Sequence, residues 1–354
     1  MTPSSIQFRR LVISHEALNE TWGRTIWNKC RRNNVDTVER SAAGLQMFKD
    51  LTSGTLIVQV APDRGWVTQA EHGILSTRPG EYYLNPIEGC RSKCSYCYLR
   101  SRPDGLSPLR LYVGIQHLYD AIDGVLARHP GPSEVLFCTG ELADSLSDAD
   151  LYPVGSLLAA WFRCKNNARL ELRTKSDNVE SLLGIDHGGR TTVSFSISPA
   201  DHVELYERGV ATLHARLSAA RACQEAKYPI AVNFEPLILT PGWKVAYREL
   251  VESLSGYVDV SVLHHISVGC LRFGSALRTE KFFANRFTGL MANGAEFIEY
   301  RPGTLNGTFP RQLRIEAYTY IASILRKHNI DAPIWWSLEE PPVLAMLEGY
   351  YGRD

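Results

Sequence analysis

The sequence lacks an excess of either charge, and it lacks any long apolar segment. Lys and Arg together number 38, as do Asp and Glu, so the 354-residue chain has a formal net charge of zero at pH 7. A neutral chain has no overall field that draws it to nucleic acid or to an anionic membrane, although a local basic groove is compatible with this composition. No stretch approaches the roughly 18 apolar residues that indicate a transmembrane helix. The first residues, MTPSSIQFRRLVISHEALNE, contain no apolar core of signal-peptide length, so we expect a cytoplasmic protein without a membrane partner.

Cysteine is too sparse for a disulfide scaffold, with eight residues in the whole chain. In a long chain without a secretion signal, cysteines are typically metal ligands, catalytic thiols or core residues. Three of them, Cys90, Cys94 and Cys97, lie within GCRSKCSYCYL. A closed structural zinc site requires four ligands, and no fourth Cys or His lies close to these three in the sequence. Three thiolates on one loop favour a [4Fe–4S] cluster with one iron open to a small molecule, with structural zinc or a chance grouping as the alternatives.

Apolar strands alternate with helical segments from about residue 81 onward. The expected strands are 53–62, 81–87, 133–140, 168–175, 191–198, 230–239 and 257–269, and the expected helices are 38–51, 113–129, 151–164, 177–184, 203–225, 243–254 and 311–328. The last six strands alternate with helices, which indicates parallel βα units that right-handed crossovers roll into a barrel. We therefore predict an α/β fold, a partial (β/α)6 TIM-like barrel over 81–273, with an N-terminal extension (1–80) and a C-terminal α+β segment (274–354) that closes the barrel and its substrate side.

The cysteine spacing C-x3-C-x2-C follows the first barrel strand and resembles that of the radical S-adenosylmethionine (SAM) enzymes. The carboxyl ends of barrel strands are where βα loops build active sites. The resemblance implies that Cys90, Cys94 and Cys97 bind a [4Fe–4S] cluster and that SAM occupies its open iron. Reductive cleavage of SAM then yields a 5′-deoxyadenosyl radical, with the electron supplied by an external donor of the flavodoxin or ferredoxin type.

Polar residues at the ends of the second, third and fourth barrel strands are candidate SAM ligands. Gly140 and Glu141 are similar to the GGE segment with which radical SAM enzymes hold the amino group of SAM, since an ammonium group needs acceptors. Lys175, Ser194 and Ser196 could contact its ribose or carboxylate. The alternatives are an acidic residue at a helix start for Glu141, and surface or capping roles for the other side chains.

The resemblance extends to one family, the spore photoproduct lyases. The segments GCRSKCSYCYL, LRLYV, FCT, LRTKSDNVESLLG, VSFSIS and PLILTPGW occur in the order and spacing of that family, over about residues 80–270. The resemblance implies repair of a thymine dimer in spore DNA, with Cys138 as the thiol that returns a hydrogen atom to the thymine radical. Tyr96 and Tyr98 match the tyrosines beside the cluster motif, one of which relays the radical, and Tyr96 is also a candidate SAM contact. The alternatives are a small buried residue for Cys138 and packing aromatics for the tyrosines.

Two segments depart from this family. CTGELADS differs from the family's usual residues after the cysteine. The second is near the C-terminus, where family members carry a glycine- and tyrosine-rich basic hairpin that extrudes the lesion from the duplex. The corresponding segment, EFIEYRPGTLNGTFPRQLRIEAY, keeps Tyr300, Arg301, Arg311 and Arg314 but not that motif. The missing motif and the neutral charge favour an alternative function, a radical SAM epimerase or related enzyme that acts on a sugar, nucleoside or peptide with the same cysteine as hydrogen donor. A non-enzymatic iron–sulfur or zinc binding module is a third hypothesis.

Three further features are expected to have structural roles. Alternation along a strand points only one of His264 and His265 into the barrel, and we interpret it as a hydrogen-bonded structural residue. Glu235 ends an apolar strand, either as a lip residue or as a group that orients a bound hydroxyl or amine. The segment IWWS, residues 334–337, is expected to pack against the barrel, with a stacking platform for bases as the alternative.

Overall fold

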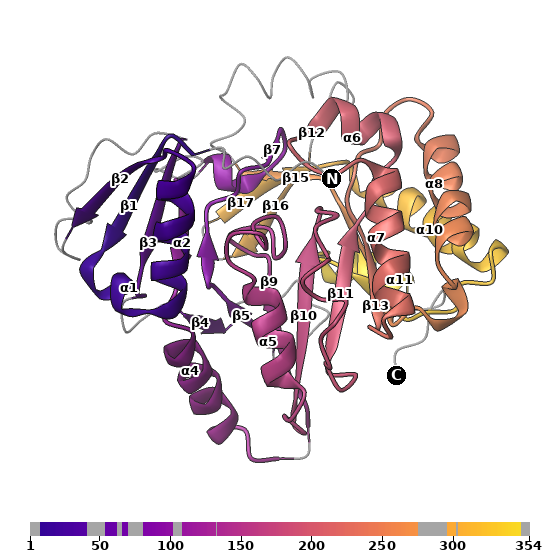
Figure 1. Cartoon of the computed structure of the whole chain (residues 1–354). Helices are drawn as coiled ribbons and strands as arrows, with labels where there is room; N and C mark the ends of the chain where they lie inside the picture. The colour runs from indigo at the N-terminus through magenta and orange to yellow at the C-terminus, as the bar shows by residue number, and fades with distance from the viewer. Residues whose placement is uncertain are drawn as a thin grey trace.

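A parallel sheet curled into half a barrel forms the centre of the chain in a computed structural model (Figure 1). The structure describes residues 8–40, 54–61, 66–69, 81–101, 108–131, 133–274, 296–301 and 304–347. No helix within these ranges is long and apolar enough to cross a membrane. The curled parallel sheet confirms the predicted partial barrel.

Neighbouring strands of the barrel sheet run parallel. In order across the sheet they are β5 (Glu81–Leu84), β9 (Val135–Thr139), β10 (Ala168–Thr174), β11 (Thr191–Ser196), β13 (Ile230–Leu237), β14 (His265–Cys270) and β18 (Ile334–Trp336). A short strand, β4 (Val67–Gln69), lies antiparallel to β5 at one edge. All six predicted barrel strands are present, but the last, predicted at 257–269, begins only at His265, because Tyr257 ends α8 and residues 260–262 form a 3-10 turn. For the segment 334–337 the sequence predicts packing only, whereas its backbone joins the sheet as β18 beside β14.

Polar and apolar residues alternate along the barrel strands, and each kind faces one side of the sheet. On β10, Leu172 alternates with Glu171 and Arg173. Helix α5 (Val154–Phe162) covers the leucine side, because a Cβ added at its Gly155 would lie 3.5 Å from Leu172 Cδ1. The outer face of the barrel is therefore apolar and covered by helices, and the polar residues point inward.

The covering helices follow the predicted apolar spacing. They are α4 (Ile115–Ala127), α5, α7 (Leu213–Glu225), α8 (Trp243–Tyr257) and α10 (Arg311–Lys327). Figure 1 shows α7 and α8 as neighbours on one side of the barrel sheet. Their outward position leaves the carboxyl ends of the strands and the inner face to the loops.

Two helix predictions fail inside the barrel. Residues 177–184 form turns. The segment 203–225 is interrupted after α6 (Ala200–Tyr206), because β12 (Glu207–Arg208) leaves the helical path. There it pairs with β7 (Lys93–Cys94) in the cysteine loop. A tertiary strand pairing thus overrides local helix propensity.

The N-terminal segment builds a second α/β layer, at the left of Figure 1. Its sheet has the order β2 (Asp36–Arg40), β1 (Arg10–Ser14), β3 (Thr55–Gln59), β8 (Leu109–Tyr112), β6 (Ile87–Glu88), with α1 (His15–Asn19) and α2 (Thr21–Arg32) following β1. Strand β3 confirms the strand predicted at 53–62. Strand β2 shows that the helix prediction for 38–51 is wrong at its start, and the rest of that segment lies outside the described residues. Because β6 and β8 come from beyond residue 80, this sheet joins the N-terminal segment to the barrel.

The C-terminal segment contributes a small antiparallel sheet beside the barrel. Its strands are β15 (Arg272–Gly274), β17 (Thr304–Thr308) and β16 (Glu296–Arg301), and helix α11 (Pro341–Leu347) ends the described chain. Strands β16 and β17 form a hairpin in the segment that lacks the family's basic motif. The segment therefore forms a hairpin although it lacks the glycine- and tyrosine-rich basic motif. Arg311 and Arg314 lie outside this hairpin, on α10, where carboxylates pair with them.

Candidate active site

The cysteine loop rests on the strand pair β7–β12. This pairing sets Cys94 opposite Glu207, and the Ser95 amide donates to the Tyr206 carbonyl at 2.8 Å. Gly209 follows with a φ of 77°, a left-handed conformation that glycine adopts without strain. The chain leaves the predicted helix here because these residues support the cysteine loop from the neighbouring βα unit.

Burial favours the neutral S–H form of two thiols in the cysteine loop when no metal is bound. Burial raises the pKa of Cys90 to about 11, with Asp144 adding to the shift, and burial raises the pKa of Cys94 to about 12. Within the described ranges, no three His, Cys, Asp or Glu side chains are arranged to hold one metal ion. A [4Fe–4S] cluster binds one thiolate per iron, so its ligands need not meet at a point. The three thiols Cys90, Cys94 and Cys97 therefore fit such a cluster as a donor set, and its binding would release protons.

A buried ion pair lies beside the cysteine loop. Glu207 Oε2 is 2.6 Å from Arg216 Nη2, and Tyr96 donates a hydrogen bond to Glu207 Oε1. Burial alone would raise the pKa of Glu207, but the charges of Lys175 and Arg216 hold it below its ordinary value. Burial raises the pKa of Tyr96, which stays a neutral phenol. Arg216 also donates to the Ser196 carbonyl at 2.8 Å. Sequence analysis missed Glu207 and Arg216 because it placed both in one continuous helix.

Strand β9 ends in a turn that requires glycine. Gly140 has a φ of 99°, and a Cβ there would come within 2.8 Å of the Arg173 carbonyl oxygen. The turn brings the next residue, Glu141, to Tyr98 of the cysteine loop. The Tyr98 hydroxyl lies 2.6 Å from the Glu141 carbonyl oxygen and 2.9 Å from its Oε1, and it can donate to either. Two residues that the sequence assigns to different tasks are thus in direct contact.

Asp144 fixes the ends of two strands next to the cysteine loop. Its carboxylate accepts the Lys175 amide at 2.6 Å. It also accepts the amides of Leu146 and Ser147 at 3.0 and 2.9 Å, an Asx-type turn. Asp144 thereby holds the loop after β9 to the end of β10, near Cys90. The sequence signal that could have found it is an Asp followed by Ser in the loop directly after a predicted strand, a pattern typical of turns.

The inner face of the barrel carries Cys138. Direct cross-strand pairing puts Tyr83, Cys138 and Glu171 side by side on this face. The Cys138 side chain is fully buried, and its Sγ accepts a hydrogen bond from Arg173 Nη2 at 3.4 Å. Glu171 Oε2 lies 3.6 Å from His265 Nε2. Cys138 thus belongs to the polar inner face and not to the apolar layer beneath the helices.

Other polar side chains continue this face across the sheet. Ser194 Oγ donates to Asn233 Oδ1 at 3.1 Å, and Ser267 donates to Glu235. His265 lies on the same face, as the alternation of the strand predicts. The signal for all of these residues is present in the sequence, because Ser, Asn and Glu alternate there with Val, Phe and Ile. A count of polar residues at every second position would have found them.

The predicted site residues fall into two groups. Around the cysteine loop and the strand ends lie Cys90, Cys94, Cys97, Tyr96, Tyr98, Gly140, Glu141 and Lys175. On the inner face lie Cys138 and Ser194, while Ser196 offers its carbonyl to Arg216. Lys175 Nζ is 6.0 Å from the centre of the Tyr96 ring, so these two residues share one side of the loop. The roles of these residues toward SAM and substrate stay predictions.

Comparison with known proteins identifies the family. The family model described as "Spore photoproduct lyase" matches residues 10–286. The chain belongs to the spore photoproduct lyase family. Spore photoproduct lyase of Bacillus subtilis is 28% identical over 193 residues, which cover 54% of this chain and 56% of that protein. The protein of the same name from Clostridium acetobutylicum is 24% identical over 261 residues, which cover 70% of this chain and 74% of that protein.

Solved structures of spore photoproduct lyases share the fold. One, complexed with dinucleoside spore photoproduct, matches with a TM-score of 0.81 at 19% identity and covers 94% of this chain and 100% of its own. Another, a variant with bound AdoMet and dinucleoside spore photoproduct, matches with a TM-score of 0.79 at 18% identity and covers 92% of this chain and 98% of its own. The sequence alignment with the Bacillus subtilis lyase spans just over half the length of that relative. At these identities the structural likeness establishes the architecture.

Proposed function

We propose that this chain is a radical SAM enzyme that repairs the spore photoproduct in DNA. One observation carries the proposal. The fully buried thiol of Cys138 lies on the polar inner face of a half barrel whose strand ends adjoin the three-cysteine loop. A thiol in the apolar layer beneath the helices could not reach a substrate, whereas a thiol on the inner face can. Membership of the spore photoproduct lyase family supports the same substrate.

Different residues around the cysteine loop would bind the iron–sulfur cluster and SAM. Cys90, Cys94 and Cys97 would hold the cluster, and the carboxylate of Glu141 would accept the amino group of SAM. Lys175, Ser194 and Ser196 would contact its carboxylate or ribose, with Tyr96 and Gly140 shaping the same pocket. When bound, the reduced cluster and SAM supply a 5′-deoxyadenosyl radical that removes a hydrogen atom from the lesion. An external donor of the flavodoxin or ferredoxin type would supply the electron.

Cys138 would return a hydrogen atom to the substrate. Its S–H bond breaks homolytically, a C–H bond forms at the thymine radical, and a thiyl radical stays on Cys138. The S–H bond is weaker than most C–H bonds, so this transfer runs downhill. Tyr98 would restore the thiol by giving up the hydrogen atom of its phenol, and one electron from the external donor together with one proton would restore the phenol.

The substrate proposal is supported by the family and by the hairpin β16–β17. Arg301 ends β16 opposite Thr304, beside the tip of this hairpin. The epimerase alternative depended on the absence of a hairpin and on the neutral charge, and family membership does not favour it. No disulfide joins cysteines within the described residues, and we place the enzyme in a reducing cytoplasm.

Anaerobically reconstituted protein tests the function. With dithionite and SAM it should form 5′-deoxyadenosine, and with dinucleoside spore photoproduct it should release the unlinked thymine dinucleotide. The cyclobutane thymine dimer of the same dinucleotide serves as control substrate and should stay intact. Absence of 5′-deoxyadenosine would refute the radical SAM chemistry. Formation of 5′-deoxyadenosine with an unchanged lesion would refute the substrate. Cys138→Ala should still cleave SAM but no longer give clean thymine product.

A further inference from the structure

Arg173 is placed against the thiol of Cys138 from the neighbouring strand. It lies on the inner face of β10, and its side chain is held by ion pairs to Glu81 and, at 3.0 Å, to Glu171. Both carboxylates are almost completely buried, with side-chain exposures of 3% and 1%. The guanidinium carbon also lies 5.9 Å from the centre of the Tyr83 ring. These contacts leave the guanidinium little freedom to move.

The hydrogen bond from Arg173 sets the direction of the Cys138 thiol. A thiol has one hydrogen to donate and a sulfur that accepts weakly, whereas a guanidinium donates only. With Nη2 of Arg173 at 3.4 Å from the sulfur, the lone pair of Sγ points to Arg173 and the S–H bond must point elsewhere. Hydrogen transfer depends on such alignment, because the donor hydrogen must lie on the line to the acceptor carbon.

Glu81 and Glu171, the two carboxylates that pair with Arg173, also affect the protonation of the Cys138 thiol. A lone guanidinium beside sulfur favours the thiolate, and a thiolate has no hydrogen atom to transfer. Glu81 and Glu171 both pair with the guanidinium of Arg173 and offset its charge. The arginine can therefore orient the sulfur while the carboxylates favour the S–H form.

We propose that Arg173, held by Glu81 and Glu171, is the positioning residue that aims the Cys138 S–H bond at the substrate radical. The inference rests on the proposed function, since it assumes that Cys138 is the hydrogen donor. The step is the one given above: the S–H bond breaks, the C–H bond forms, and the thiyl radical stays on Cys138. In this role Arg173 acts through the sulfur of Cys138.

The test measures where the hydrogen atom comes from. In deuterium oxide the exchanged thiol carries deuterium, so each successful transfer from Cys138 leaves one deuterium in the thymine product. In the Arg173→Gln variant we expect 5′-deoxyadenosine formation to stay within about twofold, while deuterated thymine per 5′-deoxyadenosine falls by about tenfold to a hundredfold. Aborted radical products should account for the difference. Arg173→Lys keeps a donor near the sulfur and should restore part of the ratio.

Arg169 provides the matched control. It lies on the same face of β10 four residues before Arg173 and pairs with Glu134, and its cross-strand neighbour on β9 is Leu136. Arg169→Gln should leave the deuterium ratio unchanged. An unchanged ratio in Arg173→Gln would overturn the proposal. An equal fall of 5′-deoxyadenosine and of thymine product would also overturn it, because it would assign Arg173 to folding or SAM binding. Failure of the proposed function itself looks different, since wild-type protein would then yield no deuterated thymine.

Discussion

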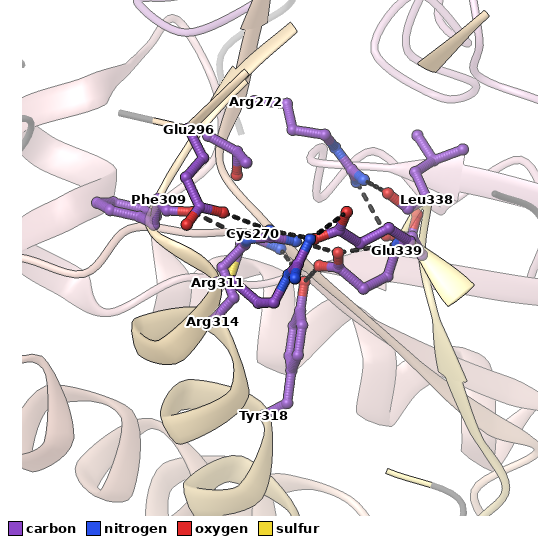
Figure 2. A network of polar contacts seen from close by, with 12 residues as sticks. Cys270, Arg272, Glu296, Phe309, Arg311, Arg314, Tyr318, Leu338 and Glu339 are labelled. Atoms are coloured by element: carbon purple, nitrogen blue, oxygen red, sulfur yellow. Dashed lines mark hydrogen bonds and ion pairs between the residues drawn. The ribbon is translucent and has the colours of Figure 1, made fainter. Parts of the chain in front are cut away.

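Two arginine–carboxylate clusters in this chain share their ingredients and differ in their partners. The first is the Arg173 cluster inside the barrel, with Glu81, Glu171 and the sulfur of Cys138. The second surrounds Arg314 of α10 in the C-terminal segment and is shown in Figure 2. The Arg173 side chain is 24% exposed, whereas the Arg314 side chain is completely buried.

The C-terminal ion cluster has oxygen acceptors for its arginine on every side. Arg314 donates to the Phe309 carbonyl at 2.8 Å, to Glu340 at 2.8 Å, to Glu296 at 3.2 Å and to Glu339. Tyr318 donates to Glu339 at 2.7 Å and accepts the Cys270 amide at 3.1 Å, which ties α10 to the end of β14 (Figure 2). These bonds join the small antiparallel sheet, α10 and the segment after β18 to the barrel.

The difference in partners indicates a difference in task. The C-terminal ion cluster connects parts of the chain that are far apart in sequence, and every donor ends on protein oxygen. The Arg173 cluster gives one donor to a sulfur atom on the face that we propose meets the substrate. We therefore expect substitutions at the site to change chemistry at nearly constant stability, and substitutions in the C-terminal ion cluster to do the reverse.

The largest effect is expected at the cysteine loop. Replacement of Cys94 by Ala removes a thiolate from the proposed cluster, so iron content and 5′-deoxyadenosine formation should fall to background. The free energy of unfolding of the iron-free protein should change far less. Iron analysis, product chromatography and urea denaturation measure the three quantities. Normal iron content in this variant would contradict the assignment of the loop.

Arg314→Met tests the other side of the comparison. Removal of one partner leaves the buried Glu339 carboxylate without its counter-charge, so the free energy of unfolding should fall by about 3–5 kcal/mol. Urea denaturation measures the loss. The control is Arg311→Met, which breaks an exposed pair with Glu340 and should cost much less. If the folded fraction of Arg314→Met makes no 5′-deoxyadenosine, the C-terminal ion cluster contributes to the chemistry of the site as well as to stability.

Two buried thiols, one in each of the compared regions, should make the stability of the protein depend on pH. Burial raises the pKa of Cys94 to about 12 and that of Cys270, at the end of β14 beside the C-terminal ion cluster, to about 12. Between about pH 8.5 and 12, both thiols therefore stay protonated in the native state but ionise in the unfolded chain. Their contribution to the free energy of unfolding is complete below about pH 8.5 and is lost as the pH rises toward 12. Between pH 8 and 10 the iron-free protein should lose about 2 kcal/mol of unfolding free energy per thiol.

The same measurement on iron-loaded protein distinguishes the contribution of Cys94 from that of Cys270. In the loaded protein Cys94 would already be a thiolate ligand, so its share of the pH-dependent loss should vanish. The share of Cys270 should persist in both forms. Urea denaturation of wild type, Cys94→Ala and Cys270→Ala at pH 8, 9 and 10 gives both shares. A pH-dependent loss that persists in iron-loaded Cys270→Ala would contradict the proposed ligand role of Cys94.

The smallest effect is expected from Tyr98→Phe. This substitution removes the hydroxyl that donates to Glu141, so the unfolding free energy should fall by about 1 kcal/mol or less. SAM cleavage should continue, while thymine product per 5′-deoxyadenosine should decline because the relay is lost. Tyr96→Phe is the matched variant, since its hydroxyl donates to Glu207. A larger fall of that product ratio in Tyr96→Phe would transfer the relay role to Tyr96.

Local pattern was enough for most of the barrel and for the cysteine motif. Strands such as 168–174 are apolar at alternate positions and bounded by turns, so period and length identify them. Strand β18 escaped prediction because three residues carry too little pattern, and only pairing with β14 makes them a strand. The helix predicted over 203–225 failed for the opposite reason, since its local pattern is helical and the pairing of Glu207 with Cys94 overrides it.

The sequence by itself determined the kind of chemistry, because three closely spaced cysteines and the order of motifs are one-dimensional facts. It also determined the alternation that makes one face of each barrel strand polar. Only the tertiary structure decided which charged groups meet. Glu81, Cys138, Glu171 and Arg173 lie on three strands separated by whole βα units, and contact between them exists only after those strands pair in register. Electrostatic and hydrogen-bond partners depend on distance in space, which the order of residues along the chain does not specify.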